Sequence, residues 1–207
     1  GSIAGSGSTD WDEETDNLGA IDYNSSDHEY YAHDTSTKIE TFYSVTDLMV
    51  YKQDKVKVLE ETMKSYVSEN ARQAMEYWRD EILNAATTGE VDKALDSGLM
   101  DMADAEDAYF QAKEDAKKEL EELLSKVVSD EAKQIVQDAI DGLDFILNSA
   151  AFPDLIPVVR EEAEYADFLY NTIAELEEAK NNAISGEAKD ALDEAIQQVK
   201  DAETADE

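Results

Sequence analysis

The net charge of this chain limits what it can fold into more than any other feature of its sequence. The 207 residues include 51 acidic and 17 basic side chains, which gives a formal net charge of −34. Small soluble domains usually carry about 2 to 8 net charges, and self-repulsion above that range opposes a compact state. Because 42% of the residues are hydrophobic, the chain can still bury a core. Its fold must therefore keep nearly all carboxylates at the surface.

Salt relieves this repulsion, because the Debye length falls from about 8 Å at 0.15 M salt to about 3 Å at 1 M. The charge therefore predicts a protein from a salt-adapted cell or its virus. Lysine outnumbers arginine, which occurs only at Arg72, Arg79 and Arg160, and this bias is less typical of halophilic surfaces. An ordinary acidic extracellular protein and a mimic of nucleic acid are the alternatives.

Apolar residues recur at seven-residue intervals between residues 42 and 77, as in a long amphipathic helix. The series comprises Phe42, Met49, Val56, Met63 and Tyr77, and Asn70 interrupts it between the last two. No glycine or proline occurs between Gly19 and Gly89, so the composition gives no sign of a break there. We expect one helix over 36–86. A short hairpin within 41–57, where β-branched residues are frequent, is the alternative.

The rest of the chain predicts further helices joined by short loops. Three of them cover about 90–97, 99–128 and 130–149. Pro153 marks a break, and the next helix has Pro157 in its first turn and ends at about 184. The last helix covers 187–202. Short loops favour antiparallel neighbours. We therefore predict an all-α fold over 35–207, an elongated antiparallel bundle of four to five helices, with no fixed internal repeat period.

Residues 1–34 differ from the rest in composition and lack apolar periodicity. Glycine, serine and acidic residues dominate, as in segments that tether a folded domain. We expect a flexible acidic N-terminal arm. Its aromatic residues have no core of their own, so they either dock on the bundle or bind a partner. These candidate partner-binding residues are Trp11, Tyr23, Tyr30 and Tyr31.

Two short patterns near the N-terminus bear on where the protein acts. Asn24-Ser25-Ser26 is a glycosylation sequon, so Asn24 is a candidate glycosylation site if the protein is exported. Gly1-Ser2 is typical of a cloning remnant. If it is one, a signal peptide or membrane anchor could have been removed with the natural N-terminus.

We expect no catalytic residue, no cofactor and no metal site. The chain has no cysteine, which excludes disulfides and thiolate chemistry. Its two histidines, His28 and His33, lie five residues apart in the arm, a spacing that does not place both on one face of a helix. The acidic run from Asp10 fails as a calcium loop, because Thr15 and Ile21 stand where glycine and glutamate are required. We therefore expect that the protein is not an enzyme.

Two hypotheses of different classes follow from these observations. The first is a non-enzymatic extracytoplasmic helical domain of a surface or envelope protein, which acts by protein contact or ligand sensing and could form oligomers. It would reach a membrane only through a segment outside residues 1–207. The second is an acidic mimic of nucleic acid in the cytoplasm of a salt-accumulating cell, where it blocks a basic nucleic-acid-binding partner. Direct binding of nucleic acid is opposed by the charge of the chain.

The charge density predicts that salt stabilises the fold. Screening weakens the repulsion between exposed carboxylates, whereas it does not weaken apolar contacts between helices. We expect the midpoint of thermal unfolding, followed by helical circular dichroism, to rise between 0.1 M and 2 M KCl. An unchanged midpoint would mean that lysine and arginine already offset the acidic groups locally, and the salt-adaptation argument would fail.

Overall fold

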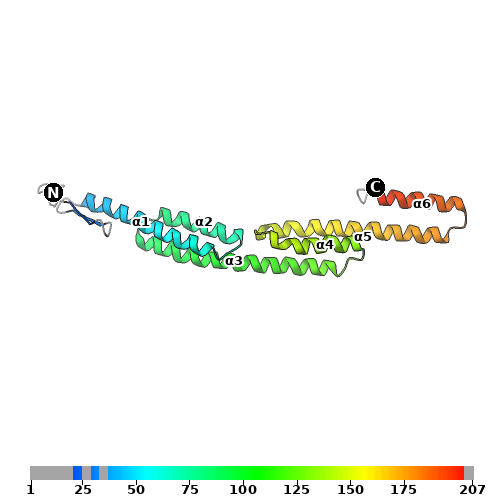
Figure 1. The fold of residues 1–207 in the computed structure, drawn as a ribbon, viewed down its shortest axis with the longest axis horizontal. Coiled ribbons are helices and arrows are strands. Elements are labelled where there is room, and N and C mark those ends of the chain that lie inside the picture. The colour runs from blue at the N-terminus through cyan, green and yellow to red at the C-terminus, as the bar shows by residue number, and fades with distance from the viewer. Residues whose placement is uncertain (1–20, 25–28, 33–36, 203–207) are drawn as a thin grey trace. The chain divides into compact units, whose positions relative to one another are not determined.

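The computed structural model describes residues 21–24, 29–32 and 37–202 of the chain. Most of these residues lie in six α-helices, and the predicted all-α fold is confirmed (Figure 1). The helices are α1 (Thr37–Met63), α2 (Glu69–Asn84), α3 (Thr88–Leu124), α4 (Asp130–Gly142), α5 (Phe152–Asn182) and α6 (Gly186–Asp201), with 3₁₀ turns at Leu143–Phe145 and Ser149–Ala151. No helix among the described residues is long and apolar enough to cross a membrane.

The segment predicted to be an arm contains an element that its composition did not indicate. Strands β2 (Ile21–Asn24) and β3 (Glu29–Ala32) pair antiparallel, with Tyr23 opposite Tyr30. Strand β3 also lies beside α1. Isoleucine and tyrosine favour extended backbone, and this preference accounts for both strands.

The prediction of one helix over 36–86 is wrong, because the chain turns between α1 and α2. Ser68 has an extended backbone, and its Oγ accepts a hydrogen bond from the N–H of Ala71. A serine N-cap of this kind begins a new helix without any glycine or proline. The region 41–57 is helical within α1, so the hairpin alternative is also wrong.

The predicted break at Gly98 is likewise absent, since α3 runs through that position and joins the expected helices over 90–97 and 99–128. A Cβ on Gly98 would lie only 2.8 Å from the Cβ of Trp78. This glycine is therefore required by the close packing of α2 against α3, and it does not end a helix.

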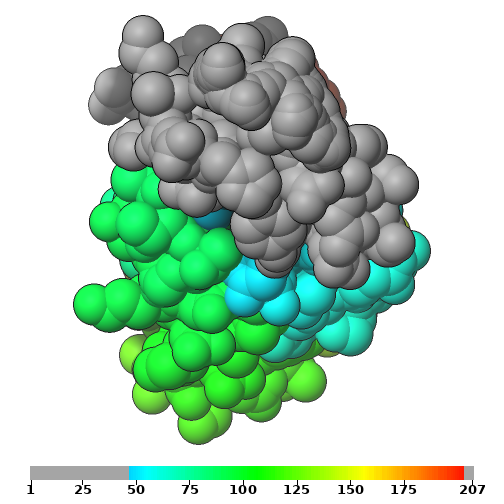
Figure 2. Space-filling model, turned by 90° about the vertical axis from the view of Figure 1, so that its left-hand side faces the viewer, coloured from blue at the N-terminus to red at the C-terminus, as the bar shows by residue number. Residues whose placement is uncertain are grey.

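The chain divides into two compact units, Gly1–Glu106 and Asp107–Glu207, and α3 contributes residues to both. The core of the first unit is formed by α1, α2 and the first part of α3. Its buried residues include Leu59, Met75, Ile82, Val91 and Met102. Figure 2 shows cyan side chains of α1 packed against green side chains of the helices that follow.

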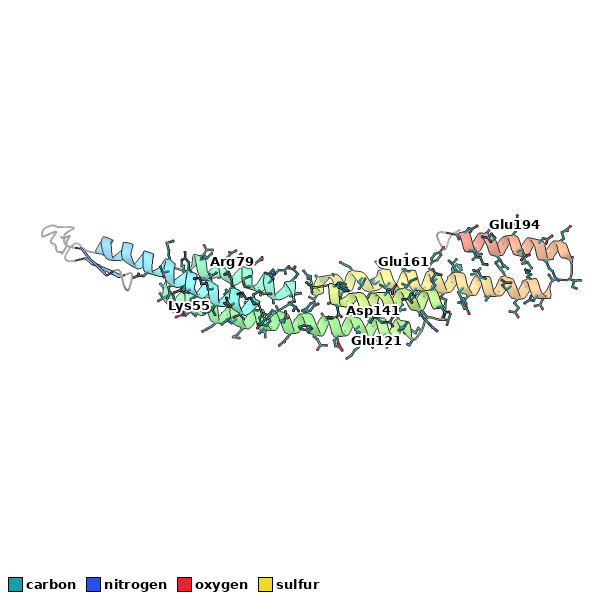
Figure 3. All side chains as sticks on the ribbon, in the orientation of Figure 1. Lys55, Arg79, Glu121, Asp141, Glu161 and Glu194 are labelled. Carbon is teal, nitrogen blue, oxygen red and sulfur yellow. The ribbon has the colours of Figure 1, made fainter. Side chains whose placement is uncertain are left out.

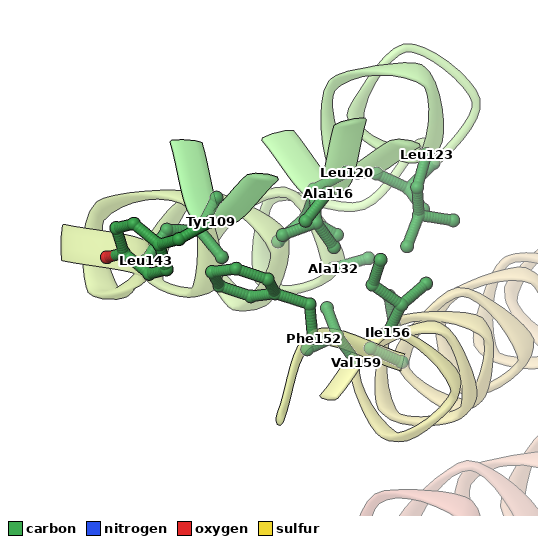
Figure 4. Close-up of a cluster of buried hydrophobic side chains, with 13 residues drawn as sticks. Tyr109, Ala116, Leu120, Leu123, Ala132, Leu143, Phe152, Ile156 and Val159 are labelled. Atoms are coloured by element: carbon green, nitrogen blue, oxygen red, sulfur yellow. The ribbon is translucent and has the colours of Figure 1, made fainter. Parts of the chain in front are cut away.

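The core of the second unit is formed by the remainder of α3, by α4 and by the first part of α5. Figure 4 shows Leu120 of α3, Ala132 of α4 and Phe152 of α5 directed into one cluster. Other members are Tyr109, Ala116, Leu123, Val136, Leu143, Ile156, Val159 and Ala163. Each unit thus buries its own apolar cluster of three helical segments.

The two cores are built in the same register, 61 residues apart. Leu59 and Leu120 are both fully buried, and α2 begins at Glu69 as α4 begins at Asp130. The other equivalent pairs of buried residues are Ser68 and Ser129, Ala71 and Ala132, Met75 and Val136, Ile82 and Leu143, Val91 and Phe152, Leu95 and Ile156, and Met102 and Ala163. The chain therefore contains a three-helix repeat, and the prediction of no fixed period is wrong.

We call these the first repeat (α1, α2 and α3 up to Glu106) and the second repeat (α3 from Asp107, α4 and α5 up to Asp167). One pair of facing positions differs between them in a compensating way. The first repeat combines Trp78 with Gly98, whereas at the equivalent positions the second combines Ala139 with Val159. The second repeat has no large side chain at the first of these positions, so the facing position can carry valine where the first repeat requires glycine.

A third copy of the pattern begins in the latter part of α5 and continues through α6, 56 residues after the second. Ser129 and Ser185 are the N-caps of α4 and α6, and each Oγ accepts from the N–H three residues later. The hydroxyl of Tyr109 donates to the carbonyl of Ile146, and that of Tyr165 donates in the same way to Ala202. Within the described residues this third repeat consists of two helices, which lie side by side in Figure 1.

Charged side chains cover the solvent-facing side of every helix from α3 to α6. Figure 3 labels one exposed carboxylate on each of them, Glu121, Asp141, Glu161 and Glu194. Ion pairs are few among the described residues, and the pair between Lys113 and Asp144 is 2.6 Å long. Most carboxylates in the described part of the chain therefore have no cation close enough to offset their charge.

The size compensation between the two repeats predicts an energetic coupling between Trp78 and Gly98. Gly98→Val adds a side chain where only a hydrogen fits, so it should lower the free energy of unfolding by about 1–3 kcal/mol. In a Trp78→Ala background the same substitution recreates the pair found in the second repeat, and its cost should disappear. Urea unfolding at a constant 2 M KCl measures both effects as a double-mutant cycle.

A matched control for this cycle is Gly142→Ala. Nothing lies within 4 Å of a Cβ added at Gly142, so no loss of stability is expected there. If Gly98→Val costs the same with and without Trp78, the two positions are independent and the compensation is a coincidence.

Candidate partner-binding groove

The structure places the aromatic candidates of the predicted arm as follows. Tyr23 lies in β2 directly opposite Tyr30 of β3, and Tyr31 lies opposite Asp22. Trp11 lies outside the described residues, as do His28 and His33. The backbone pairing thus brings three of the four aromatic positions to one two-stranded element. Asn24, the candidate glycosylation site, is the last residue of β2.

The most elaborate polar arrangement lies at the start of α2. The Glu106 carboxylate accepts from the N–H of Val67 at 2.9 Å, from the N–H of Ser68 at 3.0 Å and from the Ser68 hydroxyl at 2.6 Å. Glu106 is 7% exposed. Burial raises the pKa of this carboxyl, but the hydrogen bonds from Ser68 and Val67 outweigh burial, and the pKa lies below its usual value.

The second repeat has the same arrangement at the start of α4. The Asp167 carboxylate accepts from the N–H of Val128 at 2.9 Å and from both the N–H and the hydroxyl of Ser129 at 2.8 Å. Burial raises the pKa of Asp167, whereas these hydrogen bonds and the nearby Lys133 lower it below its usual value. We call each arrangement a carboxylate clamp. The hydrogen bonds of a clamp join the start of the second helix of a repeat to its third helical segment.

A groove of about 550 Å³ lies between α3 and the start of α5 in the second repeat. Its apolar floor is formed by Ala112, Ala116, Phe152 and Ile156, with Pro153 at the edge. Its rim carries Asp115, Glu119 and Glu122 together with Lys118. An apolar floor with a mostly anionic rim suits an apolar or aromatic side chain that has basic neighbours.

Comparison of the repeats explains why this groove is open. Tyr51 of the first repeat is equivalent to Ala112, and its hydroxyl donates to Asp92 at 2.6 Å. Lys55, equivalent to Ala116, lies over the Tyr51 ring at 4.8 Å from its centroid. The first repeat thus places a large side chain and its cover where the second has two alanines. Asp92 is replaced by Pro153, which removes the acceptor as well.

Sequence reasoning missed both the clamps and the groove. The signal for the clamps was a valine-serine pair followed by an acidic residue 38 positions after the serine, present at Ser68 and Glu106 and again at Ser129 and Asp167. The groove is visible only when the second repeat is aligned on the first. Among the described residues no group of three or more histidine or acidic side chains is placed to hold a metal ion.

Comparison of the chain with protein-family models, with curated proteins and with solved structures gives no match. The interpretation of the groove therefore rests on the internal comparison between the repeats.

The clamps predict different effects on stability for two substitutions on α3 that each replace a carboxylate with an uncharged amide. Glu106→Gln leaves the N–H of Val67 or of Ser68 facing an amide N–H₂, so it should lower stability by about 1.5–3 kcal/mol at pH 7. Asp104→Asn, a matched loss of charge at an exposed position, should be neutral or slightly stabilising because it relieves repulsion. Urea unfolding at 2 M KCl measures both.

The dependence on pH separates the clamp from simple packing. The folded pKa of Glu106 is lowered, so its stabilisation is present above the unfolded value of about 4.3 and is lost as the pH falls through the folded pKa. The difference between wild type and Glu106→Gln should therefore shrink in acid. A difference that is constant from pH 7 to pH 3 would show that the charge of Glu106 contributes nothing.

Proposed function

We propose that this chain is a non-enzymatic helical-repeat domain of a salt-adapted surface or envelope protein, and that it acts by binding a protein partner. The observation that carries the proposal is the groove at Ala112 and Ala116, which the first repeat fills with its own Tyr51 and Lys55. The second repeat has only small side chains at this position, so an open groove remains above the buried Phe152 and Ile156. Helical repeats commonly serve as binding scaffolds of this kind.

High salt favours such a mode of recognition. Charged contacts are screened at molar ionic strength, whereas contact with an apolar floor is undiminished. The acidic rim of Asp115, Glu119 and Glu122 would then keep the domain soluble and exclude acidic partners at short range. The proposed partner segment carries an aromatic or large aliphatic residue flanked by lysine or arginine.

The proposal places the domain outside the cytoplasm, with the cytoplasm of a salt-accumulating cell as the alternative. Recovery of the complete gene tests this location directly. A signal peptide or membrane segment encoded outside residues 1–207 is expected, and a gene without either would leave the extracytoplasmic assignment without support.

Filling the groove should abolish partner binding without unfolding the domain. Ala112→Tyr reproduces the side chain that the first repeat has at this position, so the fold should tolerate it. We expect immobilised wild-type chain to capture a partner from a halophile surface extract at 2 M KCl. The amount captured by Ala112→Tyr should be at least tenfold lower. Quantitative mass spectrometry of the eluate is the measurement.

Ala174→Tyr is the control, because Ala174 is exposed on α5 outside the groove, and capture should be unchanged. Equal capture by all three chains would reject the groove as the binding site. Capture of a DNA- or RNA-binding protein at low salt, competed by duplex DNA, would instead favour the acidic mimic of nucleic acid.

A further inference from the structure

In both of the other repeats an aromatic ring stands at the position of Ala112. The first repeat has Tyr51 there, and the third repeat, which follows the second by 56 residues, has Phe168. Only the second repeat has an alanine at this position, and there a groove is open between α3 and the start of α5. A ring supplied from outside the chain would therefore restore the side chain that the second repeat lacks.

The first repeat shows what a phenol ring requires at this position. The Tyr51 hydroxyl donates a hydrogen bond to the Asp92 carboxylate at 2.6 Å. The residue equivalent to Asp92 in the second repeat is Pro153, which lines the groove and whose side chain has no acceptor. A phenol bound in the groove with the orientation of Tyr51 would thus bury a donor without a partner, and that loss opposes binding. A ring without a hydroxyl group has no such cost.

The carboxylates at the rim of the groove do not replace Asp92 as an acceptor. Asp115 and Glu122 correspond to Asp54 and Glu61 of the first repeat, which are also acidic. The Tyr51 hydroxyl nevertheless binds Asp92 and neither of these two residues. The direction of the ring therefore takes its hydroxyl away from the rim and toward the helix that begins the third segment of the repeat.

The cation that covers the ring in the first repeat is also missing from the second. The Lys55 ammonium lies 4.8 Å from the centroid of the Tyr51 ring, and its equivalent is Ala116. Three carboxylates and one lysine form the rim of the groove, so the rim attracts a cation. A ligand that brings its own cation beside its ring would supply both parts that the second repeat lacks.

We propose that the groove binds a phenyl ring that has a cation beside it, as in phenylalanine next to lysine or arginine on a protein partner, and that Pro153 selects phenylalanine against tyrosine. The inference rests on the proposed function, because it takes the groove as the site of partner contact. It goes further by naming the residue type that the groove recognises and the residue of this chain that determines the choice.

Two small probes that differ only in the hydroxyl group test this selection. Phenethylamine and tyramine each carry a ring and, at pH 7, an ammonium group. In the full chain with isotope-labelled alanine, the methyl resonances of Ala112 and Ala116 report on the groove during titration at 2 M KCl. We expect both probes to shift these resonances, and phenethylamine to bind about fivefold more tightly than tyramine. Any apolar surface favours the less polar probe, so the decisive comparison is between variants.

Pro153→Asp gives the second repeat the acceptor that Asp92 supplies in the first. The ratio of the two dissociation constants should change by about tenfold in favour of tyramine, because a phenol hydroxyl can now donate to a carboxylate. Pro157→Asp is the matched control, since it makes the same replacement at an exposed position of α5 that does not line the groove. It adds the same charge and should leave the ratio unchanged.

A second pair of variants keeps the test valid if Pro153→Asp loses helicity by circular dichroism. Pro153→Asn supplies an uncharged acceptor and should shift the ratio in the same direction, with Pro157→Asn as its control. A ratio that is equal in wild type and in the folded Pro153 variant would overturn the role of Pro153. A shift of equal size in the Pro157 control would do the same, because charge alone would then explain it.

Ala112→Tyr tests whether the ring binds in the groove at all. This variant fills the groove from inside the chain, so neither probe should shift the Ala116 resonance. Probes that shift no groove resonance in wild type, or that bind Ala112→Tyr as well as wild type, would overturn the proposal. The proposed function is tested separately by partner capture. Capture that Ala112→Tyr abolishes, together with a probe ratio that no Pro153 variant changes, rejects the present inference alone.

Discussion

A carboxylate that binds the turn between two helices is the interaction on which each complete repeat depends. The first N–H groups of any helix lack partners inside the helix. Ser68 satisfies one such group on α2, and Glu106 then binds the serine and the residue before it. Since Glu106 comes from the third helical segment, one side chain fixes both the start of the second segment and the position of the third. Asp167 does the same in the second repeat.

These clamps also show how a chain with a net charge of −34 uses its charge selectively. Most carboxylates remain in solvent, where only salt moderates their repulsion. The two clamp residues are at least partly buried and are surrounded by hydrogen-bond donors, which is the environment in which an ionised carboxylate is best tolerated. The same acidic residue type thus destabilises the fold at the surface and stabilises it at two interior positions.

The sequence was sufficient for the fold class and for helices whose ends carry local signals. The helices expected from 130 and from 187 begin at Asp130 and at Gly186, and Ser129 and Ser185 are their N-caps. The turn at Ser68 escaped detection because apolar residues continue with helical spacing on both sides of it. The groove could not be predicted from Ala112 alone, because the small side chain becomes informative only when it is compared with Tyr51 at the equivalent position of the first repeat. The tyrosines of β2 and β3 can be identified from the sequence as aromatic residues without a core, but their pairing depends on backbone contacts that composition does not reveal.

The exchange of Trp78 and Gly98 for Ala139 and Val159 has a consequence for how the chain assembles. Repeats with the same register invite a helix of one to pack on a helix of the other while the protein folds. Trp78 would collide with Val159 in such a mispaired state, and Ala139 against Gly98 would leave a void. Each α-helical pair therefore recognises its own partner by shape, and the correct assembly is selected although both repeats follow one plan.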